Sequence, residues 1–313
     1  MSSNDANLAS LVAGVPGPVQ PGPGRFSPFG FMAGIRPTEL LAVVPFILFA
    51  VLFLIAPTFY VVVSAFLDRA GNFTFANVGG LFSEQIRASF WISIRISATS
   101  AILGAIFGLL IALAILRGRL PGWIRSTVMT FSGVASNFAG IPLAFAFLAT
   151  IGRLGLITIL LKFFGLDIYR GGFNLLSFWG LTLTYLYFQI PLMILIIAPA
   201  IDGLKKEWSE AASTLGASTW QFWRYVGLPV LWPNLLGTLS LLFANAFGAV
   251  ATAYALTGMS INMVTIQLYA QIRGDALGDP GLGAALALGM IVITAFANVI
   301  YLVVRARAER WLK

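Results

Sequence analysis

The stretch DGLKKEWSEAASTLGASTWQFWRYVGLPVLWP, residues 202–233, is a polar segment between two long apolar runs. It holds six charged residues and four of the chain's eight tryptophans. Through its first half, apolar side chains recur at the spacing of one helical face, and the polar side chains lie away from that face. The apolar positions are Leu204, Trp208, Ala211, Ala212 and Leu215. The pattern predicts a short amphipathic helix.

The second half of the segment predicts a corner and a second short helix. Gly216 stands where the end of a helix favours a left-handed residue. Ser218, with Gln221 three residues later, predicts a capping box that opens the next helix. Pro229 is expected to end that helix, because proline lacks the N–H that a helix interior needs.

The composition of the whole chain indicates a polytopic membrane protein. Of its 313 residues, 59% are hydrophobic and only 10% are charged, and the mean hydropathy is +0.91. Average chains carry roughly 25% charged residues. Six apolar segments are each long enough to cross a bilayer as a helix, which takes roughly 20 residues. They cover residues 40–66, 90–116, 127–150, 176–200, 235–256 and 284–304. The fold class predicted is an all-α bundle of six transmembrane helices, residues 38–313, in contact with the lipid bilayer.

The ends of these segments predict the orientation of the chain. On the side of the N-terminus lie twelve Lys and Arg residues, on the other side six, and Arg95 lies in the second span. The positive-inside rule therefore places both termini and residues 202–233 in the cytoplasm. The basic residues stand at the ends of apolar runs, so no nucleic-acid partner is expected. Residues 1–37, rich in Pro and Gly, are predicted to be a disordered cytoplasmic tail.

The sequence offers no set of residues for catalysis or metal binding. It contains no His and no Cys, and the G-x-x-x-x-G-K-[ST] phosphate-binding loop is absent. The chain is therefore not expected to be an enzyme, to hydrolyse ATP or to hold a cofactor of its own.

The spacing within residues 202–233 resembles the signature of a known family. Glu210, Ala211 and Ala212 are followed after three residues by Gly216, and after nine more by VGLP, residues 226–229. This resembles the EAA motif of permease subunits of bacterial ATP-binding-cassette importers, with Val226 in place of Ile. The resemblance extends over about residues 40–313, because six spans with this segment between the fourth and fifth are typical of the type I, MetI-like permease bundle.

The resemblance implies that this segment docks in a groove of a separate ATPase subunit and carries its motion to the membrane helices. The implied coupling residues are Trp208, Glu210, Ala211, Ala212, Leu215, Gly216, Leu228 and Pro229. The implied partners are two ATP-binding subunits that hold ATP and Mg²⁺, a second permease, more often a non-identical sister chain, and an extracytoplasmic solute-binding protein. The implied location is the bacterial inner membrane.

Two further stretches resemble a narrower group. ILRGRLPGW, residues 115–123, and the closing residues 281–311 look like permeases for polyamines, ferric iron and aminoethylphosphonate. A small organic solute of the polyamine or aminoethylphosphonate type is favoured. A polyamine is a polycation, and the spans contain no acid that would bind it. This argues against a tight polyamine site in this chain.

Polar residues inside apolar spans are candidates for a translocation path, because they are costly there. They are Arg95, Asn137, Gln189 and Asn245. For Arg95 the alternative is a side chain that extends to the outer interface. For the three amides it is hydrogen bonding between packed spans. Tyr185 is interpreted as an interfacial anchor.

Small residues four apart, at Gly104 and Gly108 and at Ala244 and Gly248, predict close helix packing. In the outer loop, Leu156, Ile159, Leu160 and Phe163 predict the apolar side of a short interfacial helix.

An ion-gradient-driven secondary transporter is the alternative function. Such a transporter more often has an intramembrane acid for ion coupling, and this chain has none. The importer hypothesis predicts that solute uptake stops when cellular ATP is depleted while the ion gradient is kept. Uptake that persists in this assay would favour the secondary transporter.

Overall fold

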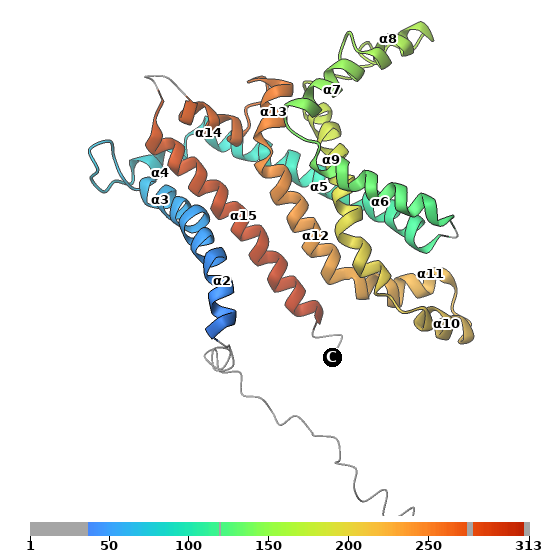
Figure 1. Ribbon diagram of the computed structural model, residues 1–313. Helices are drawn as coiled ribbons and strands as arrows, with labels where there is room; N and C mark the ends of the chain where they lie inside the picture. Colours follow the sequence, from blue (N-terminus) through green and yellow to red (C-terminus); the bar gives the residue numbers. More distant parts are fainter. Residues whose placement is uncertain (1–36, 119, 274–277, 310–313) are drawn as a thin grey trace, which may run out of the picture. The chain divides into compact units, whose positions relative to one another are not determined.

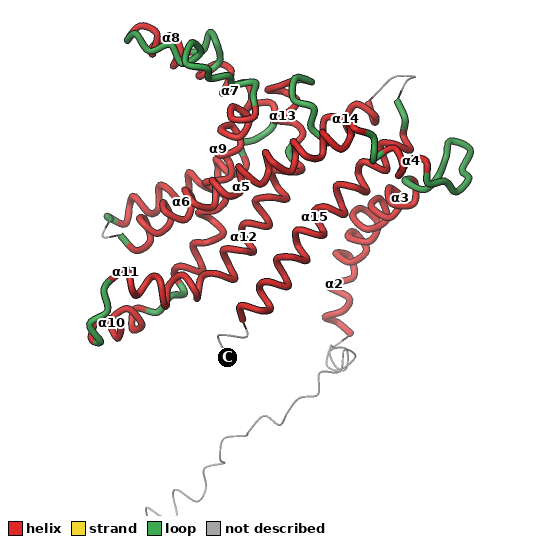
Figure 2. The backbone as a smooth tube through the Cα atoms, turned by 180° about the vertical axis from the view of Figure 1, so that it is seen from behind, coloured by secondary structure: helices red, strands yellow, loops and turns green. Residues whose placement is uncertain are grey.

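The computed structural model describes residues 37–118, 120–273 and 278–309. Apart from one isolated bridge between Leu67 and Phe73, these residues form helices joined by loops and turns, as Figure 2 shows. The predicted all-helical class is confirmed. The predicted tail lies outside the described residues except for Pro37.

Six helical stretches are long and apolar enough to cross a membrane, which is the predicted number, but the third and fifth differ in their bounds from the predicted residues 127–150 and 235–256. They are Val43–Ser64, Glu84–Arg117, Ile141–Phe163, Phe178–Asp202, Thr219–Gly248 and Pro280–Arg307. The described residues divide into two units between Thr58 and Phe59. The first unit contains α2 (Pro37–Ala50), the π-helix η2 (Val51–Ile55) and the start of α3 (Ala56–Ser64).

The second unit contains the remaining helices. They are the rest of α3, α4 (Ala76–Gly80), α5 (Glu84–Arg117), α6 (Gly122–Asn137), α7 (Ile141–Ile151), α8 (Leu156–Phe163), α9 (Phe178–Asp202), α10 (Lys206–Thr214), α11 (Thr219–Phe222), the π-helix η3 (Trp223–Gly227), α12 (Leu228–Gly248), α13 (Val250–Thr257), α14 (Val264–Arg273) and α15 (Pro280–Glu309). Figure 1 shows α10 and α11 at one end of α9 and α12, and α13 and α14 at the other.

The centre of this unit is the close packing of α5 on α9. A Cβ atom added at Gly104 would lie 2.7 Å from the Cβ of Gln189, and one added at Gly108 would lie 2.5 Å from the Cβ of Met193. Glycine is therefore required for the two backbones to approach so closely. The predicted close packing is confirmed for this pair of glycines. At Gly248 it is wrong, because no atom lies within 4 Å of the position of an added Cβ.

Two predicted spans are interrupted. The first break lies beside Gly140 and Pro142, where the sequence favours a proline break that faces a cavity. The same interpretation is wrong at Pro191, which lies inside the continuous helix α9. The third predicted span, residues 127–150, is divided into α6 and α7 by Phe138–Gly140, and the fifth, residues 235–256, is divided into α12 and α13 at Ala249. Gly140 has φ +76° and ψ −148°, a backbone conformation that L side chains rarely adopt. A pattern of apolar residues does not reveal such breaks, because both sides of each break are apolar.

Pro229 does not end the helix that begins at Thr219, contrary to the sequence prediction. The chain runs through η3 into α12, where Pro229 occupies the first turn. In a π-helical turn the N–H of Leu228 bonds to the carbonyl of Trp223, five residues back. The wider turn accommodates a proline that would disrupt a regular α-helix. The π-helix η2 likewise ends two residues before Pro57.

The close packing of α5 and α9 predicts opposite effects of one substitution at two glycines. Gly108→Ala forces a methyl group against Met193 and the carbonyl of Ile190, and we expect it to lower the free energy of unfolding by about 1–3 kcal/mol. Gly133, inside α6, has open space around its added Cβ. Gly133→Ala should raise the free energy of unfolding, by up to about 1 kcal/mol, through helix propensity. Denaturant unfolding in detergent measures both, and equal effects would contradict this packing.

Candidate coupling segment and translocation path

The candidate coupling segment, residues 202–233, has the two short helices predicted from the sequence. The first is α10, and Gly216 follows it with φ +78°. The hydroxyl of Ser218 accepts the N–H of Gln221 at 3.3 Å, and the Gln221 side chain accepts the N–H of Ser218 at 2.7 Å. The predicted left-handed corner and capping box are confirmed.

Most of the implied coupling residues lie on the exposed surface of this segment. The side chain of Leu215 is 86% exposed and that of Trp208 is 38% exposed, and Glu210 and Ala211 are also exposed. Ala212 is half-buried. Large apolar side chains that remain exposed together mark an interaction surface.

Three further candidate coupling residues lie in the turn after α10 and at the start of α12. Gly216 lies in the exposed turn after α10, and Leu228 and Pro229 begin α12, with Leu228 half-buried and Pro229 exposed. The predicted apolar face is wrong at one end, because Leu204 precedes α10 and is 3% exposed within the core. Leu204 therefore anchors the segment.

The two helix breaks lie beside each other and are held by hydrogen bonds between spans. The N–H of Gly140 donates to Oγ1 of Thr252 at 2.7 Å, which joins the first break to α13. The hydroxyl of Tyr185 donates to the carbonyl of Ala249 at 2.9 Å, which joins α9 to the second break. Tyr185 is fully buried. Its interpretation as an interfacial anchor is therefore wrong.

A cavity of 390 Å³ opens at the two breaks. Apart from Phe188, its described lining residues are mostly small, none is charged, and its polar side chains are Ser136, Asn245 and Thr252. The helix ends at the breaks add backbone N–H and C=O groups, because the first and last turns of a helix leave such groups without intrahelical partners. The cavity can therefore offer hydrogen bonds of both kinds to a polar solute, and none of its described lining side chains is charged.

The four predicted path residues have different positions. Asn245 is exposed and lines the cavity. Asn137 is exposed at the end of α6, next to the lining residue Ser136, and its amide donates to the carbonyl of Gly133 at 2.9 Å. Gln189 is fully buried and donates to the carbonyl of Leu242 at 2.9 Å. This contact is the interhelical hydrogen bond given as the alternative in the sequence analysis.

Arg95 lies apart from these amides. Its guanidinium is exposed and stacks over the ring of Phe178, 5.2 Å from the ring centre. Phe178 is the first residue of α9, and Gln189 lies eleven residues further along that helix, about 16 Å at 1.5 Å per residue. This position agrees with a side chain that extends toward one end of the span.

The sequence analysis missed Thr252 as a site residue and misassigned Tyr185. A threonine or tyrosine inside a span gives no signal by its type, because both occur at interfaces and in packed helices. The usable signal was Gly140 followed by Pro142, a pair that favours a break and a new helix start.

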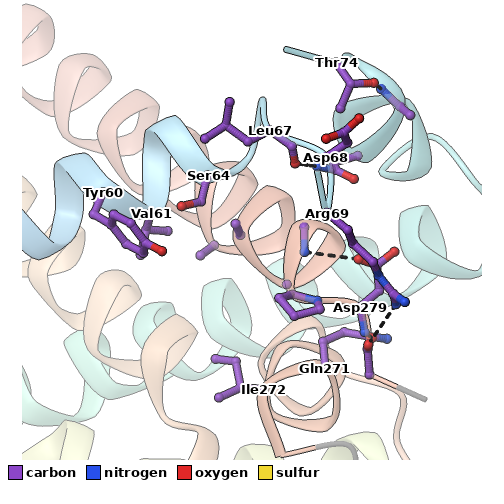
Figure 3. Close-up of a pocket in the computed structure, with 18 of the residues that line it drawn as sticks. Tyr60, Val61, Ser64, Leu67, Asp68, Arg69, Thr74, Gln271, Ile272 and Asp279 are labelled. Carbon is purple, nitrogen blue, oxygen red and sulfur yellow. Dashed lines mark hydrogen bonds between the residues drawn. The ribbon is translucent and has the colours of Figure 1, made fainter. Parts of the chain in front are cut away.

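A second cavity, of 940 Å³, lies among the end of α3, the loop after it, and α14 with α15. In Figure 3, Arg69, Gln271 and Asp279 lie on one side of it and Tyr60 on the other. Arg69 donates to the carbonyl of Gly278 at 3.2 Å, and Gln271 accepts the N–H of Asp279 at 3.0 Å. These polar groups hold loops and helix ends together.

The helix predicted in the outer loop is present as α8. All four of its predicted apolar residues are exposed: Leu156, Ile159, Leu160 and Phe163. The helix prediction is confirmed, and its location at a membrane interface stays a prediction.

Residues 104–310 match the family described as binding-protein-dependent transport system inner membrane component. The chain belongs to this family. It is therefore a transport component and a permease subunit of the importer type, which argues against the secondary transporter.

Curated relatives of this permease differ in the solutes they are named for. The chain is 27% identical to the thiamine transport system permease protein ThiP of Escherichia coli (strain K12), over 66% of this chain and 37% of that protein. It is 28% identical to the molybdenum transport system permease protein ModB of Mycobacterium tuberculosis (strain ATCC 25618 / H37Rv), over 65% and 74%. It is 25% identical to the sulfate transport system permease protein CysT of E. coli (strain K12), over 68% and 72%.

Solved structures share the fold. A bacterial ABC transporter involved in the import of the acidic polysaccharide alginate matches with a TM-score of 0.69 at 20% identity, over 88% of this permease and 96% of that chain. The MetNI methionine ABC transporter matches with a TM-score of 0.55 at 15% identity, over 72% and 99%. The predicted MetI-like permease fold is confirmed.

The hydrogen bonds at the breaks predict that the hydroxyl groups of Thr252 and Tyr185 stabilise the fold in addition to the packing of the two side chains. Thr252→Val leaves the N–H of Gly140 without its partner, and Tyr185→Phe removes the bond that joins α9 to the carbonyl of Ala249. Each should lower the free energy of unfolding by about 1–3 kcal/mol. The matched control is Thr238→Val, because the buried Thr238 bonds only to the carbonyl of Asn234 in its own helix. A Thr238→Val variant as unstable as Thr252→Val would contradict this role.

Proposed function

We propose that this permease forms the path for a small polar solute in an ATP-binding-cassette importer and is coupled to ATP hydrolysis on a separate subunit. The observation that carries the proposal is the position of the coupling segment. It presents Trp208, Glu210 and Leu215 on an exposed surface, has the EAA spacing, and continues without a break into α12. The other end of α12, at Gly248, lines the cavity at the helix breaks.

The mechanism we propose begins at α10, which docks on an ATP-binding subunit. When ATP and Mg²⁺ close two such subunits, α10 moves, and the continuous helix from Thr219 to Gly248 carries this motion to the break at Ala249. Because α13 starts beyond the break, α12 can change direction there while α13 stays bonded to Gly140. The cavity then opens to one side or the other, and ATP selects between these two states by binding one of them better.

The proposed assembly contains two ATP-binding subunits, a second permease that is a non-identical sister chain, and an extracytoplasmic binding protein that delivers the solute. Two solved structures of similar fold support the binding protein and the ATP-binding subunits as partners. One was solved with an alginate pentasaccharide-bound periplasmic protein, and another is an ABC transporter for methionine. The excess of basic residues on the side of the termini supports both termini in the cytoplasm.

For the solute we propose a small phosphonate of the aminoethylphosphonate type in preference to a polyamine. No acidic side chain is among the described residues that line the cavity, so nothing there would neutralise a polycation. The sulfate and molybdenum relatives are named for solutes whose oxyanions are tetrahedral, and a phosphonate group has that shape. Uptake of labelled aminoethylphosphonate that spermidine does not inhibit would support this choice, and the reverse pattern would overturn it.

The coupling proposal predicts that Glu210→Arg releases the ATPase. The chain is tagged, extracted in mild detergent with its neighbouring gene products, and tested for an ATPase that co-purifies. Glu210 is exposed and carries one charge toward the docking surface, so reversal should lower ATPase recovery by about tenfold or more, as expected for loss of a charge-assisted contact.

Glu84→Arg is the matched control, because Glu84 is also exposed but lies at the start of α5. It should leave ATPase recovery unchanged. The proposal is contradicted if the wild-type chain, still folded, brings no ATPase with it. Equal recovery with Glu210→Arg and wild type would contradict the role of Glu210.

A further inference from the structure

Two arginines bind the end of α9, directly before the coupling segment. Arg117, in the last turn of α5, donates through Nη2 to the carbonyls of Ile201 at 3.0 Å and Leu204 at 2.6 Å. Arg125, in the first turn of α6, forms an ion pair with Asp202 at 2.7 Å. In the sequence both arginines had the appearance of topology signals only.

The Arg117 contact adds a charged donor at the end of α9, where the carbonyl of Ile201 also accepts the N–H of Leu204 at 3.2 Å and Leu204 lies two residues beyond the helix. The last carbonyls of a helix have no intrahelical donor, and a cation near the C-terminus is favoured by the helix dipole. The side chain of Leu204 is also packed in the core beside α5, α9 and α12. Leu204 is thus held by both its carbonyl and its side chain, two residues before α10 begins.

The link between α9 and α10 is therefore not free to absorb motion. It consists of Gly203, Leu204 and Lys205, and without the arginines the packed side chain of Leu204 would remain as its anchor. With them, a displacement of α10 pulls on α5 through Arg117 and on α6 through Arg125.

The two ends of the coupling segment lead to the same cavity. One end runs through α11 into α12, whose last residue, Gly248, lines the cavity. The other end is bonded through Arg125 to α6, whose Ser136 also lines it. The helices α6 and α12 end at the two breaks that Gly140 and Thr252 join.

We infer that Arg117 and Arg125 are positioning residues that tie the α9 end of the coupling segment to α5 and α6, so that motion of α10 reaches both walls of the cavity. This inference rests on the proposed function and adds a second route of coupling to the one through α12. It assigns to the end of α5 and the start of α6 a part in transport that is separate from ATPase docking.

The test is a charge exchange in the whole transporter, reconstituted in liposomes with its ATPase and binding protein. Solute uptake per ATP hydrolysed is measured, together with ATPase recovery and thermal stability. Arg125→Glu places two carboxylates together and should lower uptake per ATP by about two- to five-fold, the range that an exposed ion pair supports. The double variant Arg125→Glu/Asp202→Arg should restore the wild-type ratio, and ATPase recovery should stay unchanged throughout.

Arg117→Gln should lower uptake per ATP by about tenfold, because it removes charge-assisted bonds to one carbonyl in the last turn of α9 and one in the link to α10. The matched control is Arg307→Glu, which reverses an exposed charge in the last turn of α15. It should leave uptake per ATP at the wild-type value.

Two results would overturn the inference while the proposed function stands. One is a wild-type ratio of uptake to hydrolysis in Arg125→Glu, with the ATPase bound. The other is a parallel fall of uptake, hydrolysis and thermal stability that the charge exchange does not reverse, which would make the ion pair a stabilising contact only. Failure of the proposed function is recognised separately, because the wild-type chain then recovers no ATPase.

Discussion

Backbone groups inside a bilayer must find hydrogen-bond partners within the protein, because each unsatisfied group costs several kcal/mol there. A chain with interrupted spans meets this constraint only if other side chains replace the missing helical bonds. Here Thr252 accepts the N–H of Gly140, which no helix satisfies, and Tyr185 adds a second donor to the carbonyl of Ala249, the residue that caps α13. The two breaks lie beside each other, and each is held by one of these hydrogen bonds. The cavity exists because the helices stop there.

The close packing of α5 and α9 supports this arrangement. Gly104 and Gly108 let the two helices approach to backbone contact, so Gln189 and Tyr185 on α9 reach α12 and the break at its end. A larger side chain at either glycine would separate the helices that hold the breaks in place. The helices that line the cavity are thus held in place by the packing of α5 on α9, which lies outside it.

At the other end of the same helices the constraint is relaxed, and exposed polar structure becomes possible. The coupling segment leaves Trp208 and Leu215 exposed, although burial of such side chains is normally favourable. Its two junctions with the spans are firm, one through the continuous helix into α12 and one through Leu204 in the core. A segment that is exposed in the middle and fixed at both ends is suited to receive a motion and pass it on.

Local features of the chain were predicted well from sequence because their causes are local. The number of spans follows from apolar length, the left-handed Gly216 from the end of a helix, and the capping box from Ser218 and Gln221. The prediction that Pro229 ends a helix failed because its cause is not local. A π-helical turn depends on the tertiary fit of the whole helix and not on the proline alone.

The sequence by itself determined a six-span helical permease with a polar segment at a fixed spacing between the fourth and fifth spans. Only the tertiary structure decided that span five breaks at Ala249, which polar side chains meet, and that Arg117 and Arg125 contact the end of α9. The physical reason is that hydrophobic periodicity reports how each helix meets lipid and core. A hydrogen bond such as Gly140 to Thr252 joins residues 112 positions apart, so neither one carries a local sign of its partner.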